Sequence, residues 1–279
     1  MLRMRKDFEL TCADGAKLFA RVWEAEQPRA VLCLTHGLGE QGERYVPFAE
    51  VMNANGITVY CHDQRGHGRN VQKKSRRGIA RMDDLERDVM TLIDHAKKET
   101  GLPVILFGHS LGGLVALYTT LHAKPEIAGS IVTSPWLKLA GGPPAPLLDI
   151  VSNMADVLAN VSISNGLSAS DLCRDEAVCA AYKPDPYNHE KIGLGLAGDA
   201  HKASKWVLAH LEELTVPLLL CHGDADKICA VEGSRALAEK AQGVHYVEYA
   251  GGYHELHNEP ALREALFAEE LRFIDQILE

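Results

Sequence analysis

Short runs of apolar residues alternate with stretches of helical periodicity along most of the chain, which is the pattern of an α/β fold. Strands are predicted over residues 17–23, 30–37, 56–63, 103–110, 128–135, 216–223 and 244–251. The later segments are nearly continuous runs rich in Val, Ile and Leu, as expected for strands of a parallel sheet that are buried on both faces. Segment 17–23 alternates more strongly, which favours an antiparallel strand at an edge of the sheet.

Helical patterns follow most of these strands and predict helices that flank the sheet. They cover residues 45–55, 82–100, 111–123, 233–242 and 260–278. Pro260 would open the last helix, since a proline in the first turn loses no intrahelical hydrogen bond. We therefore predict an α/β protein with a mostly parallel central sheet between layers of helices.

Residues 136–211 interrupt this alternation, because they contain no convincing strand. The segment begins with the Gly- and Pro-rich hinge "AGGPPAP" and continues with an amphipathic helix predicted over 147–161. The apolar stripe of that helix is formed by Leu147, Leu148, Val151, Met154, Leu158 and Val161. We predict a core made of residues 1–135 and 212–279 and a largely helical cap made of 136–211. The stripe either packs only on the main sheet or also covers an apolar substrate pocket.

The net charge of −9 argues against a general affinity for nucleic acids or anionic membranes. One basic stretch runs against this trend, with Arg65, Arg69, Lys73, Lys74, Arg76 and Arg77. It is interpreted either as a solvated loop or as a patch that contacts phosphate or lipid headgroups.

The seven cysteines contain no CxxC pair, so neither a zinc-ligand pattern nor a thioredoxin motif is present. Reduced thiols and a cytoplasmic location are expected. The first ten residues lack the apolar region of a secretory signal, and no apolar run approaches the roughly 20 residues that would span a bilayer.

The sequence "GHSLG" at 108–112 lies between a predicted strand and a predicted helix. It matches the nucleophile elbow G-x-S-x-G, in which a strained turn exposes the serine hydroxyl. Glycine at 108 and 112 would let the strand and the helix pass closely on either side. Ser110 is therefore the predicted nucleophile.

A serine nucleophile needs a base and an acid that orients it, and in this arrangement they follow in the order serine, acid, histidine. "HGDAD" follows the strand at 216–223, and "YHELH" follows the strand at 244–251. We predict Asp226 as the acid, with Asp224 as the less favoured alternative that would cap the turn. We predict His254 as the base, and His257 as part of the approach to the last helix.

The oxyanion of the reaction would be stabilised by two backbone amides. One is the amide of Leu111, directly after the predicted nucleophile. The other is the amide of Leu38, in the turn "LTHGLGE" after an early core strand.

Five motifs resemble, in order and spacing, those of monoacylglycerol lipases and lysophospholipases, which are α/β-hydrolases related to the serine aminopeptidase family. They are "HGLGEQGERY", "DQRGHGRN", "GHSLGG", "HGDADKI" and "YHELHNE". The resemblance implies the α/β-hydrolase fold with a helical cap inserted after the sixth strand. It also implies a triad of Ser110, Asp226 and His254 and an oxyanion amide at Leu38.

Glu40 and Arg44 fall where the family has polar residues near the alcohol-binding side. Together with the cap residues Leu147, Leu148, Val151 and Met154, they are the candidates for substrate binding. Asp63, Arg65 and His67 of "DQRGHG" resemble scaffold residues that hold the loop beside the elbow. Gln41 and Asn70 depart from the residues common in relatives, which are His and Ser. The cap matches only in position, helical character and the sequence "DPY" at 185–187.

These features predict hydrolysis of carboxylic esters of single-chain lipids through an acyl-enzyme, with neither a cofactor nor a metal ion. The histidines of "HELH" do not have zinc-ligand spacing. Alternatives are a lysophospholipase, a short-chain carboxylesterase, a serine aminopeptidase and a catalytically silent binding protein on the same fold. An aminopeptidase would need carboxylates in the cap, for which Asp171, Asp175 and Glu176 are candidates. The apolar cap helix also suggests transient, peripheral contact with a lipid interface.

Overall fold

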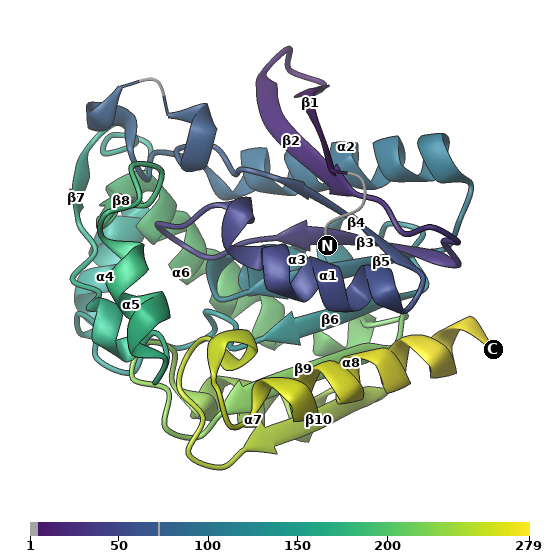
Figure 1. The fold of residues 1–279 in the computed structure, drawn as a ribbon. Helices are drawn as coiled ribbons and strands as arrows, with labels where there is room; N and C mark the ends of the chain where they lie inside the picture. The colour runs from purple at the N-terminus through teal and green to yellow at the C-terminus, as the bar shows by residue number, and fades with distance from the viewer. Residues whose placement is uncertain (1–4, 72) are drawn as a thin grey trace.

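An eight-stranded, mostly parallel sheet forms the centre of the structure, a computed structural model that describes residues 5–71 and 73–279 (Figure 1). The strands are β1 (Arg5–Thr11), β2 (Lys17–Trp23), β3 (Ala30–Thr35), β4 (Ile57–His62), β5 (Val104–His109), β6 (Gly129–Thr133), β9 (Leu218–Gly223) and β10 (Val244–Tyr249). Their order is β1-β2-β4-β3-β5-β6-β9-β10. All neighbours from β4 to β10 run parallel, whereas β1–β2 and β2–β4 are antiparallel.

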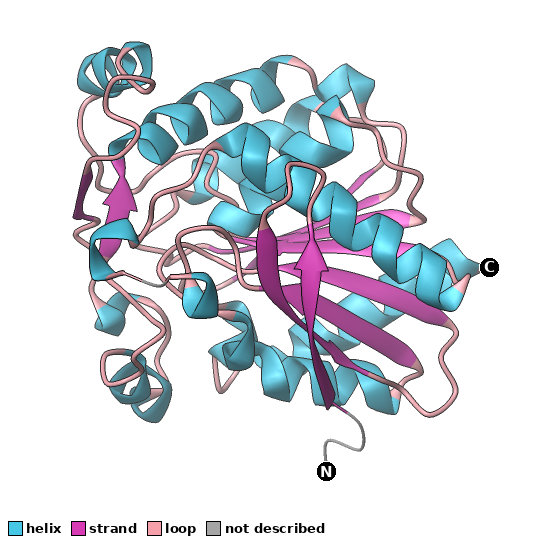
Figure 2. Ribbon diagram, turned by 90° about the horizontal axis from the view of Figure 1, so that it is seen from above, coloured by secondary structure: helices cyan, strands magenta, loops and turns pink. Residues whose placement is uncertain are grey.

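Helices cover both faces of this sheet, as Figure 2 shows from above. α1 (Val46–Ala54) and α8 (Arg263–Leu278) pack on one face, while α2 (Met82–Thr100), α3 (Leu111–His122) and α7 (Val231–Lys240) pack on the other. α6 (Leu194–Ala209) packs on the outside of α2 and α3. Within β3, Leu32 and Leu34 point to the face covered by α1 and α8. Val31 and Cys33 point to the face covered by α2 and α3. This alternation explains why the central strands are continuous apolar runs, because each face is buried against a layer of helices.

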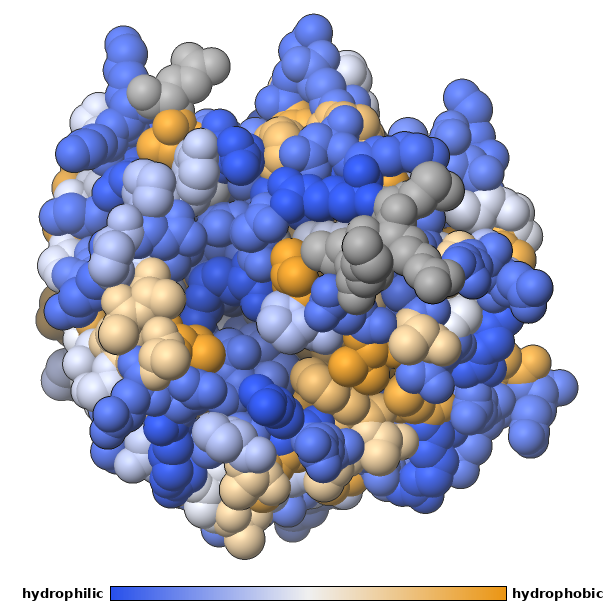
Figure 3. Space-filling view, in the orientation of Figure 1, coloured by the Kyte–Doolittle hydropathy of each residue, from blue (hydrophilic) through white to orange (hydrophobic). Residues whose placement is uncertain are grey.

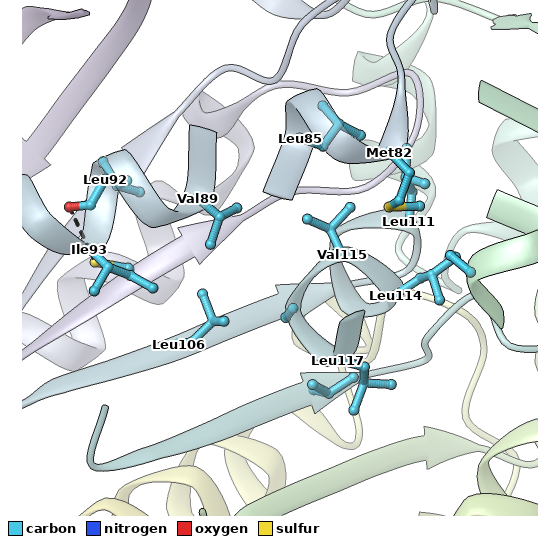
Figure 4. Close-up of a cluster of buried hydrophobic side chains, with 14 of the residues drawn as sticks. Met82, Leu85, Val89, Leu92, Ile93, Leu106, Leu111, Leu114, Val115 and Leu117 are labelled. Carbon is cyan, nitrogen blue, oxygen red and sulfur yellow. Dashed lines mark hydrogen bonds between the residues drawn. The ribbon is translucent and has the colours of Figure 1, made fainter. Parts of the chain in front are cut away.

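The core beneath α2 and α3 is drawn in Figure 4, where apolar side chains from both helices converge above Leu106 of β5. The face of the molecule drawn in Figure 3 is mostly hydrophilic, with hydrophobic residues in small groups. Among the described residues, no helix combines the length and the apolar character needed to cross a bilayer.

The mostly parallel sheet flanked by helices is confirmed, and three details of the prediction are wrong. β1 was missed, because "RKDFELT" carries four charged residues and leaves much of its length exposed. β2 is antiparallel as predicted, but β1 lies outside it, so β2 is not the edge. The last helix begins at Arg263 rather than Pro260, since the chain first passes through a turn in which the Leu262 amide donates to the Glu259 carbonyl. Residues 1–4, part of the predicted signal-free N-terminus, lie outside the described residues.

Residues 136–211, called the inserted segment from here on, follow β6 and precede β9. They contain α4 (Ala145–Asn153), β7 (Ser162–Ser164), α5 (Glu176–Tyr182), β8 (Lys191–Gly193) and α6. The chain also forms short 3₁₀ turns at Gly42–Tyr45, Gly68–Asn70, Lys74–Arg76, Ala169–Asp171, Leu211–Glu213 and Leu256–Asn258. The short antiparallel pair β7–β8 contradicts the expectation that the inserted segment has no strand.

The single helix predicted over 147–161 is wrong in its second half, because α4 ends at Asn153 and turns follow. The chain bends there to follow the surface of α6. Two glycines of α6 allow the close approach: a Cβ at Gly198 would lie 2.9 Å from the Ser152 Cα, and a Cβ at Gly195 would lie 2.9 Å from the Ala159 Cα. The contact is closed by the Ser152 hydroxyl, which donates to the Gly198 carbonyl at 3.0 Å.

Candidate active site

The turn between β5 and α3 holds Ser110 in a backbone conformation that is rare outside glycine, with φ 55° and ψ −118°. Its flanking glycines have no space for a side chain. A Cβ at Gly108 would lie 2.3 Å from the Gly112 carbonyl oxygen, and a Cβ at Gly112 would lie 2.2 Å from the Thr35 carbonyl oxygen. The predicted reason for both glycines is therefore confirmed. Strain of this kind, maintained by the surrounding structure, is typical of functional positions.

Asp226 lies on the loop after β9 and accepts hydrogen bonds on both carboxylate oxygens. Oδ1 accepts from the Ile228 and Cys229 amides at 2.7 and 3.0 Å. Oδ2 accepts from His254 Nδ1 at 2.7 Å and from His222 Nε2 at 3.1 Å. The side chain is fully buried. Burial alone would raise the pKa of Asp226, but the two histidines hold it well below its usual range.

His254 lies on the loop after β10, buried against Asp226. Burial alone would lower the pKa of His254, but the charge of Asp226 and its hydrogen bond raise it above the ordinary value of 6.5. Ser110 and His254 line the same small cavity, with Asp226 on the far side of the imidazole. The structure thus brings the three predicted residues to the carboxyl ends of β5, β9 and β10, at the edge of the sheet where sites in open α/β sheets are found.

The residues predicted as less favoured alternatives lie elsewhere. Asp224 is exposed, and its carboxylate accepts from the Gly251 amide at 2.5 Å, as expected for a residue that caps the turn. His257 lies in the turn before α8 with its ring stacked on Tyr45 at 4.9 Å between centroids. Burial lowers the pKa of His257 to about 4, so this imidazole is neutral at ordinary pH.

The two predicted oxyanion donors border the same space. Leu111 is the first residue of α3, where the backbone amides have no intrahelical acceptor. Leu38 lines both cavities that contain Ser110. The loop that carries Leu38 is attached to the inserted segment, since the Gly39 carbonyl accepts from the Tyr182 hydroxyl at 2.9 Å and from the His189 amide at 2.7 Å. Gly39 itself has φ +79°, and a Cβ there would lie 2.3 Å from the His189 carbonyl oxygen.

A cavity of about 390 Å³ extends from Ser110 into the inserted segment. Its walls are mainly apolar, with Leu38, Trp136, Leu139, Leu147, Leu148, Val151, Ile163, Ile192, Leu194 and Ile228. Three of the four predicted cap residues line this cavity. Met154 is the exception, because it lies where α4 has already ended and is 43% exposed.

A second, much smaller cavity of about 10 Å³ lies on the His254 side of Ser110, enough for about one water molecule. Its lining includes Glu40, Arg44, His109, Tyr182 and Glu255. Arg44 is held between two carboxylates: Nη1 donates to Glu40 Oε2 at 2.5 Å and to Glu255 Oε1 at 2.6 Å, and Nη2 donates to Glu255 Oε2 at 2.7 Å. Glu40 and Arg44 were predicted here. Glu255 was not assigned, although it directly follows His254 in the motif "YHELHNE".

The motif "DQRGHG" forms the predicted network beside the elbow. Buried Asp63 accepts from Arg21 Nη2 at 3.1 Å, from the Gly42 amide at 3.1 Å and from the Arg69 amide at 2.9 Å. Arg65 pairs with Asp88 and Asp14, at 2.7 Å in each case.

The two positions that depart from the family pattern also take part in local contacts. Gln41 Nε2 donates to Asp185 Oδ2 at 3.1 Å, which links the loop of Leu38 to the "DPY" sequence. Asn70 Oδ1 accepts from the Phe19 amide at 2.8 Å. Neither residue contacts Asp226 or His254.

The arginines of the basic stretch mostly bind this chain. Arg76 donates to the Asn160 side chain at 2.7 Å, and Arg77 donates to the Pro186 carbonyl at 2.6 Å. Arg69 stacks over the Tyr187 ring at 4.6 Å. These contacts tie the stretch to the inserted segment. Within the described residues, no three His, Cys, Asp or Glu side chains are placed to hold a metal ion.

The sheet topology, the strained serine turn at its carboxyl edge and the inserted segment above it define the class as an α/β-hydrolase. Residues 26–261 match the model of the family described as "Serine aminopeptidase, S33". The chain belongs to this family of hydrolases. The predicted α/β-hydrolase fold and lipase- or esterase-type hydrolase class are both confirmed.

The relatives of this chain are named for different activities. The monoacylglycerol lipase of Mycolicibacterium smegmatis is 31% identical over 261 residues, which cover 92% of each chain. Phospholipase YtpA of Bacillus subtilis is 32% identical over 263 residues, which cover 92% of this chain and 99% of that one. The crystal structure of the monoacylglycerol lipase of Paleococcus ferrophilus superposes with a TM-score of 0.84 at 29% identity, covering 94% of this chain and 100% of that chain.

Proposed function

We propose that this protein hydrolyses carboxylic esters of single-chain lipids, monoacylglycerols in particular, through an acyl-enzyme on Ser110. The observation that carries the proposal is the apolar cavity of about 390 Å³ that ends at Ser110. A fatty acyl chain fits such walls, because each buried CH₂ contributes about 0.8 kcal/mol. The His254–Asp226 pair on the other side of Ser110 supports the assignment of base and acid.

The proposed mechanism has two steps. Ser110 Oγ attacks the ester carbonyl carbon while its proton passes to His254, and the amides of Leu38 and Leu111 donate to the carbonyl oxygen as it becomes negative. His254 then gives the proton to the alcohol oxygen, which leaves. Water, deprotonated by His254, attacks the acyl-enzyme in the second step and releases the fatty acid. Asp226 stabilises the imidazolium that forms in each step, which agrees with the raised pKa of His254.

The environment of the three acidic candidates disfavours the aminopeptidase alternative. Asp171 lines the apolar cavity, but Lys227 Nζ lies 3.9 Å from its carboxylate. Asp175 caps α5 and accepts from the Ala177 and Val178 amides. Glu176 is exposed in the first turn of the same helix. None of the three offers an unpaired carboxylate inside the cavity for a substrate ammonium group.

We also propose that the inserted segment, acting as a cap, rests on lipid surfaces when substrate enters. The large apolar side chains that are exposed among the described residues are Leu147, Ile150, Met154, Val157, Val161 and Ile163. All of them belong to this segment, and Leu147 and Ile163 also line the apolar cavity. Such a cluster at a cavity mouth favours peripheral contact with lipid. The seven free thiols agree with a cytoplasmic location.

A substrate panel tests the enzymatic proposal. It compares an oleoyl monoacylglycerol, an oleoyl lysophospholipid, a short p-nitrophenyl ester and an aminoacyl anilide, each with the native protein and with Ser110→Ala. The monoacylglycerol should be hydrolysed with the highest kcat/KM, and Ser110→Ala should lower the rate by roughly 10⁴-fold or more. Covalent labelling by a fluorophosphonate should also be lost.

Ser134→Ala is a matched control, because Ser134 is also a buried serine of positive φ at the end of a neighbouring strand, outside both cavities. This variant should keep its activity and its labelling. Preferred cleavage of the anilide, or activity retained in Ser110→Ala, would contradict the proposal.

A further inference from the structure

The histidine of the motif "HGDADKI", His222, has no part in the proposed mechanism, yet its ring reaches the predicted acid. It is the last residue but one of β9 and is fully buried. Its Nε2 lies 3.1 Å from Asp226 Oδ2 and 3.1 Å from the Cys229 carbonyl oxygen. An ionised carboxylate and a carbonyl can only accept hydrogen bonds, so Nε2 carries a hydrogen and donates to both. His222 lines neither cavity that contains Ser110, so it is placed to act on the acid and not on the substrate.

The His222 ring is held on its other side as well. Its Nδ1 lies 2.7 Å from the hydroxyl oxygen of Ser234, a fully buried residue of α7. Cys229, whose carbonyl accepts from His222, donates its own amide to Asp226 Oδ1 at 3.0 Å. His222 therefore binds one carboxylate oxygen directly and also binds the turn that supplies a donor to the other. The orientation of the Asp226 carboxylate is thus set from a buried strand, and not by its own loop alone.

Two imidazoles share one oxygen of the acid. Asp226 Oδ2 accepts from His254 Nδ1 at 2.7 Å and from His222 Nε2 at 3.1 Å. Burial would raise the pKa of Asp226, and the charge of His254 and the hydrogen bonds from both histidines lower it. A carboxylate that is already stabilised by His222 attracts the imidazolium of His254 less strongly than one bound by His254 alone.

Other ionisable groups face these two histidines, and none of them has a hydrogen bond to His222 in the part of the chain that the structure describes. Those near His254 are Glu40, Arg44, His109, Glu255 and His257. Glu248 lies beside His222 in the register of β9 and β10, but Arg235 binds its carboxylate at 2.6 and 2.9 Å. A change at His222 that leaves the fold intact therefore acts on His254 through Asp226.

We propose that His222 is a positioning residue of the triad: its Nε2–H fixes the Asp226 carboxylate for His254 and moderates how strongly that carboxylate holds the imidazolium. This inference rests on the proposed ester hydrolysis by Ser110, Asp226 and His254. Loss of the N–H has two consequences. The pKa of His254 rises further, so more of the base is protonated at a given pH. The carboxylate also loses one of its fixed contacts, so the imidazole is less well oriented and kcat falls.

The experiment measures kcat, KM and the pH dependence of kcat/KM for p-nitrophenyl butyrate in the native protein and four variants. His222→Leu removes the donor, and His222→Gln places an amide N–H at the position of Nε2. Ser234→Ala removes the contact that holds the ring. His62→Leu is the matched control, because His62 is also a fully buried histidine near the carboxyl end of a sheet strand, β4. Neither of its ring nitrogens has a hydrogen-bond partner among the described residues.

In His222→Leu the acid limb of kcat/KM should move upward by about 0.5 pH unit, because Asp226 then holds the imidazolium of His254 more strongly. The kcat should fall about 10-fold with KM unchanged. Ser234→Ala should show a smaller shift in the same direction, and His222→Gln and His62→Leu should keep the native limb. A merely structural role of His222 would lower the yield of folded protein without moving the limb.

An unchanged acid limb in a folded His222→Leu would overturn the proposal, and so would a limb in His222→Gln that shifts as far as in His222→Leu. If His222→Leu does not fold, Ser234→Ala decides, since a limb that stays in place there contradicts the proposed support of the ring. Absence of ester hydrolysis in the native protein would instead refute the proposed function. The two failures are therefore distinguishable.

Discussion

Asp226 is the residue whose surroundings explain most about the site. Four N–H groups reach its two oxygens, two from the backbone and two from the imidazoles of His222 and His254. His222 is fixed in turn by Ser234, whose hydroxyl lies 2.7 Å from Nδ1. These contacts hold Asp226 as a charged carboxylate in a buried place, and its charge keeps His254 basic. His222 thus contacts Asp226 at the same carboxylate oxygen that accepts from His254.

Removing the negative charge of Asp226 should shift the pH dependence of kcat/KM. His254 must be neutral to accept the Ser110 proton, so kcat/KM should fall as the pH drops through its folded pKa, which Asp226 raises above 6.5. In Asp226→Asn the raising charge is gone and burial lowers the pKa, so the acid limb should shift to lower pH. The limiting rate should also fall about 10⁴-fold, because the imidazolium loses its partner.

The measurement is kcat/KM for a soluble ester between about pH 5 and 9. Asp224→Asn serves as the control, since Asp224 caps a turn and contacts neither histidine. Its acid limb should coincide with that of the native protein. A limb that stays in place in Asp226→Asn would show that His254 is not the titrating base.

Among single residues, sequence patterns predicted those whose proposed roles depend on local spacing. Ser110 follows from the elbow, and Asp226 and His254 follow from the loops after two late strands. Glu255 and His222 could not be assigned, because their roles come from contacts across the fold. Arg44 and Glu255 are separated by 211 positions in the chain, and nothing local to either indicates that they pair. A charged residue directly after the predicted base was the available signal.

Among the secondary-structure elements, α8 contains the least expected side chain. Glu270 is fully buried, and neither carboxylate oxygen has a hydrogen-bond partner among the described residues. Burial raises its pKa well above 4.5, so the group is protonated in the folded protein at pH values where it ionises on unfolding. Stability is therefore lost as the pH rises above the unfolded pKa. The helix keeps this residue at the expense of stability near neutral pH.

Glu270→Met should raise the unfolding free energy at pH 7 by about 1–3 kcal/mol, because it removes an unpaired buried polar group. The corresponding increase in Tm is about 2–4 °C per kcal/mol for a chain of this size. Thermal unfolding at several pH values measures it, and the gain should shrink towards pH 4. Glu264→Met on the exposed face of the same helix is the control, with an expected change within about 0.5 kcal/mol. A loss of stability in Glu270→Met would contradict the inference that the buried Glu270 carboxyl lowers the unfolding free energy at pH 7.

Sequence patterns predicted elements well where burial on both faces left continuous apolar runs, as in β3, β5 and β9. They failed where contact with another element determines the local structure. β1 carries charged side chains and becomes a strand because it pairs with β2 over its whole length. α4 has the periodicity of a longer helix but ends at Asn153, because the glycines of α6 draw the following chain onto that helix. Neither pairing is visible in a local window of sequence.

For the molecule as a whole, contact with lipid surfaces gives a further prediction. Ile150 and Val157 are 56% and 80% exposed and do not line the apolar cavity. The double variant Ile150→Ser/Val157→Ser should weaken binding to phosphatidylcholine vesicles about 10-fold, since it removes apolar area from the proposed contact. Vesicle co-sedimentation measures this change. Hydrolysis of a soluble short-chain ester should stay unchanged, and a parallel loss of that activity would indicate damage to the fold instead.

The attachment of the Leu38 loop to the inserted segment limits how this enzyme could be recombined with its relatives. The Gly39 carbonyl is shared by the Tyr182 hydroxyl and the His189 amide, and Gln41 bonds to Asp185. A chimera that exchanged residues 136–211 alone would replace the partners in all three contacts, and the loop that carries a proposed oxyanion donor would keep its position only if the new segment formed them again. The segment is therefore not an interchangeable module: a working graft would have to transfer the turn at 37–41 together with it.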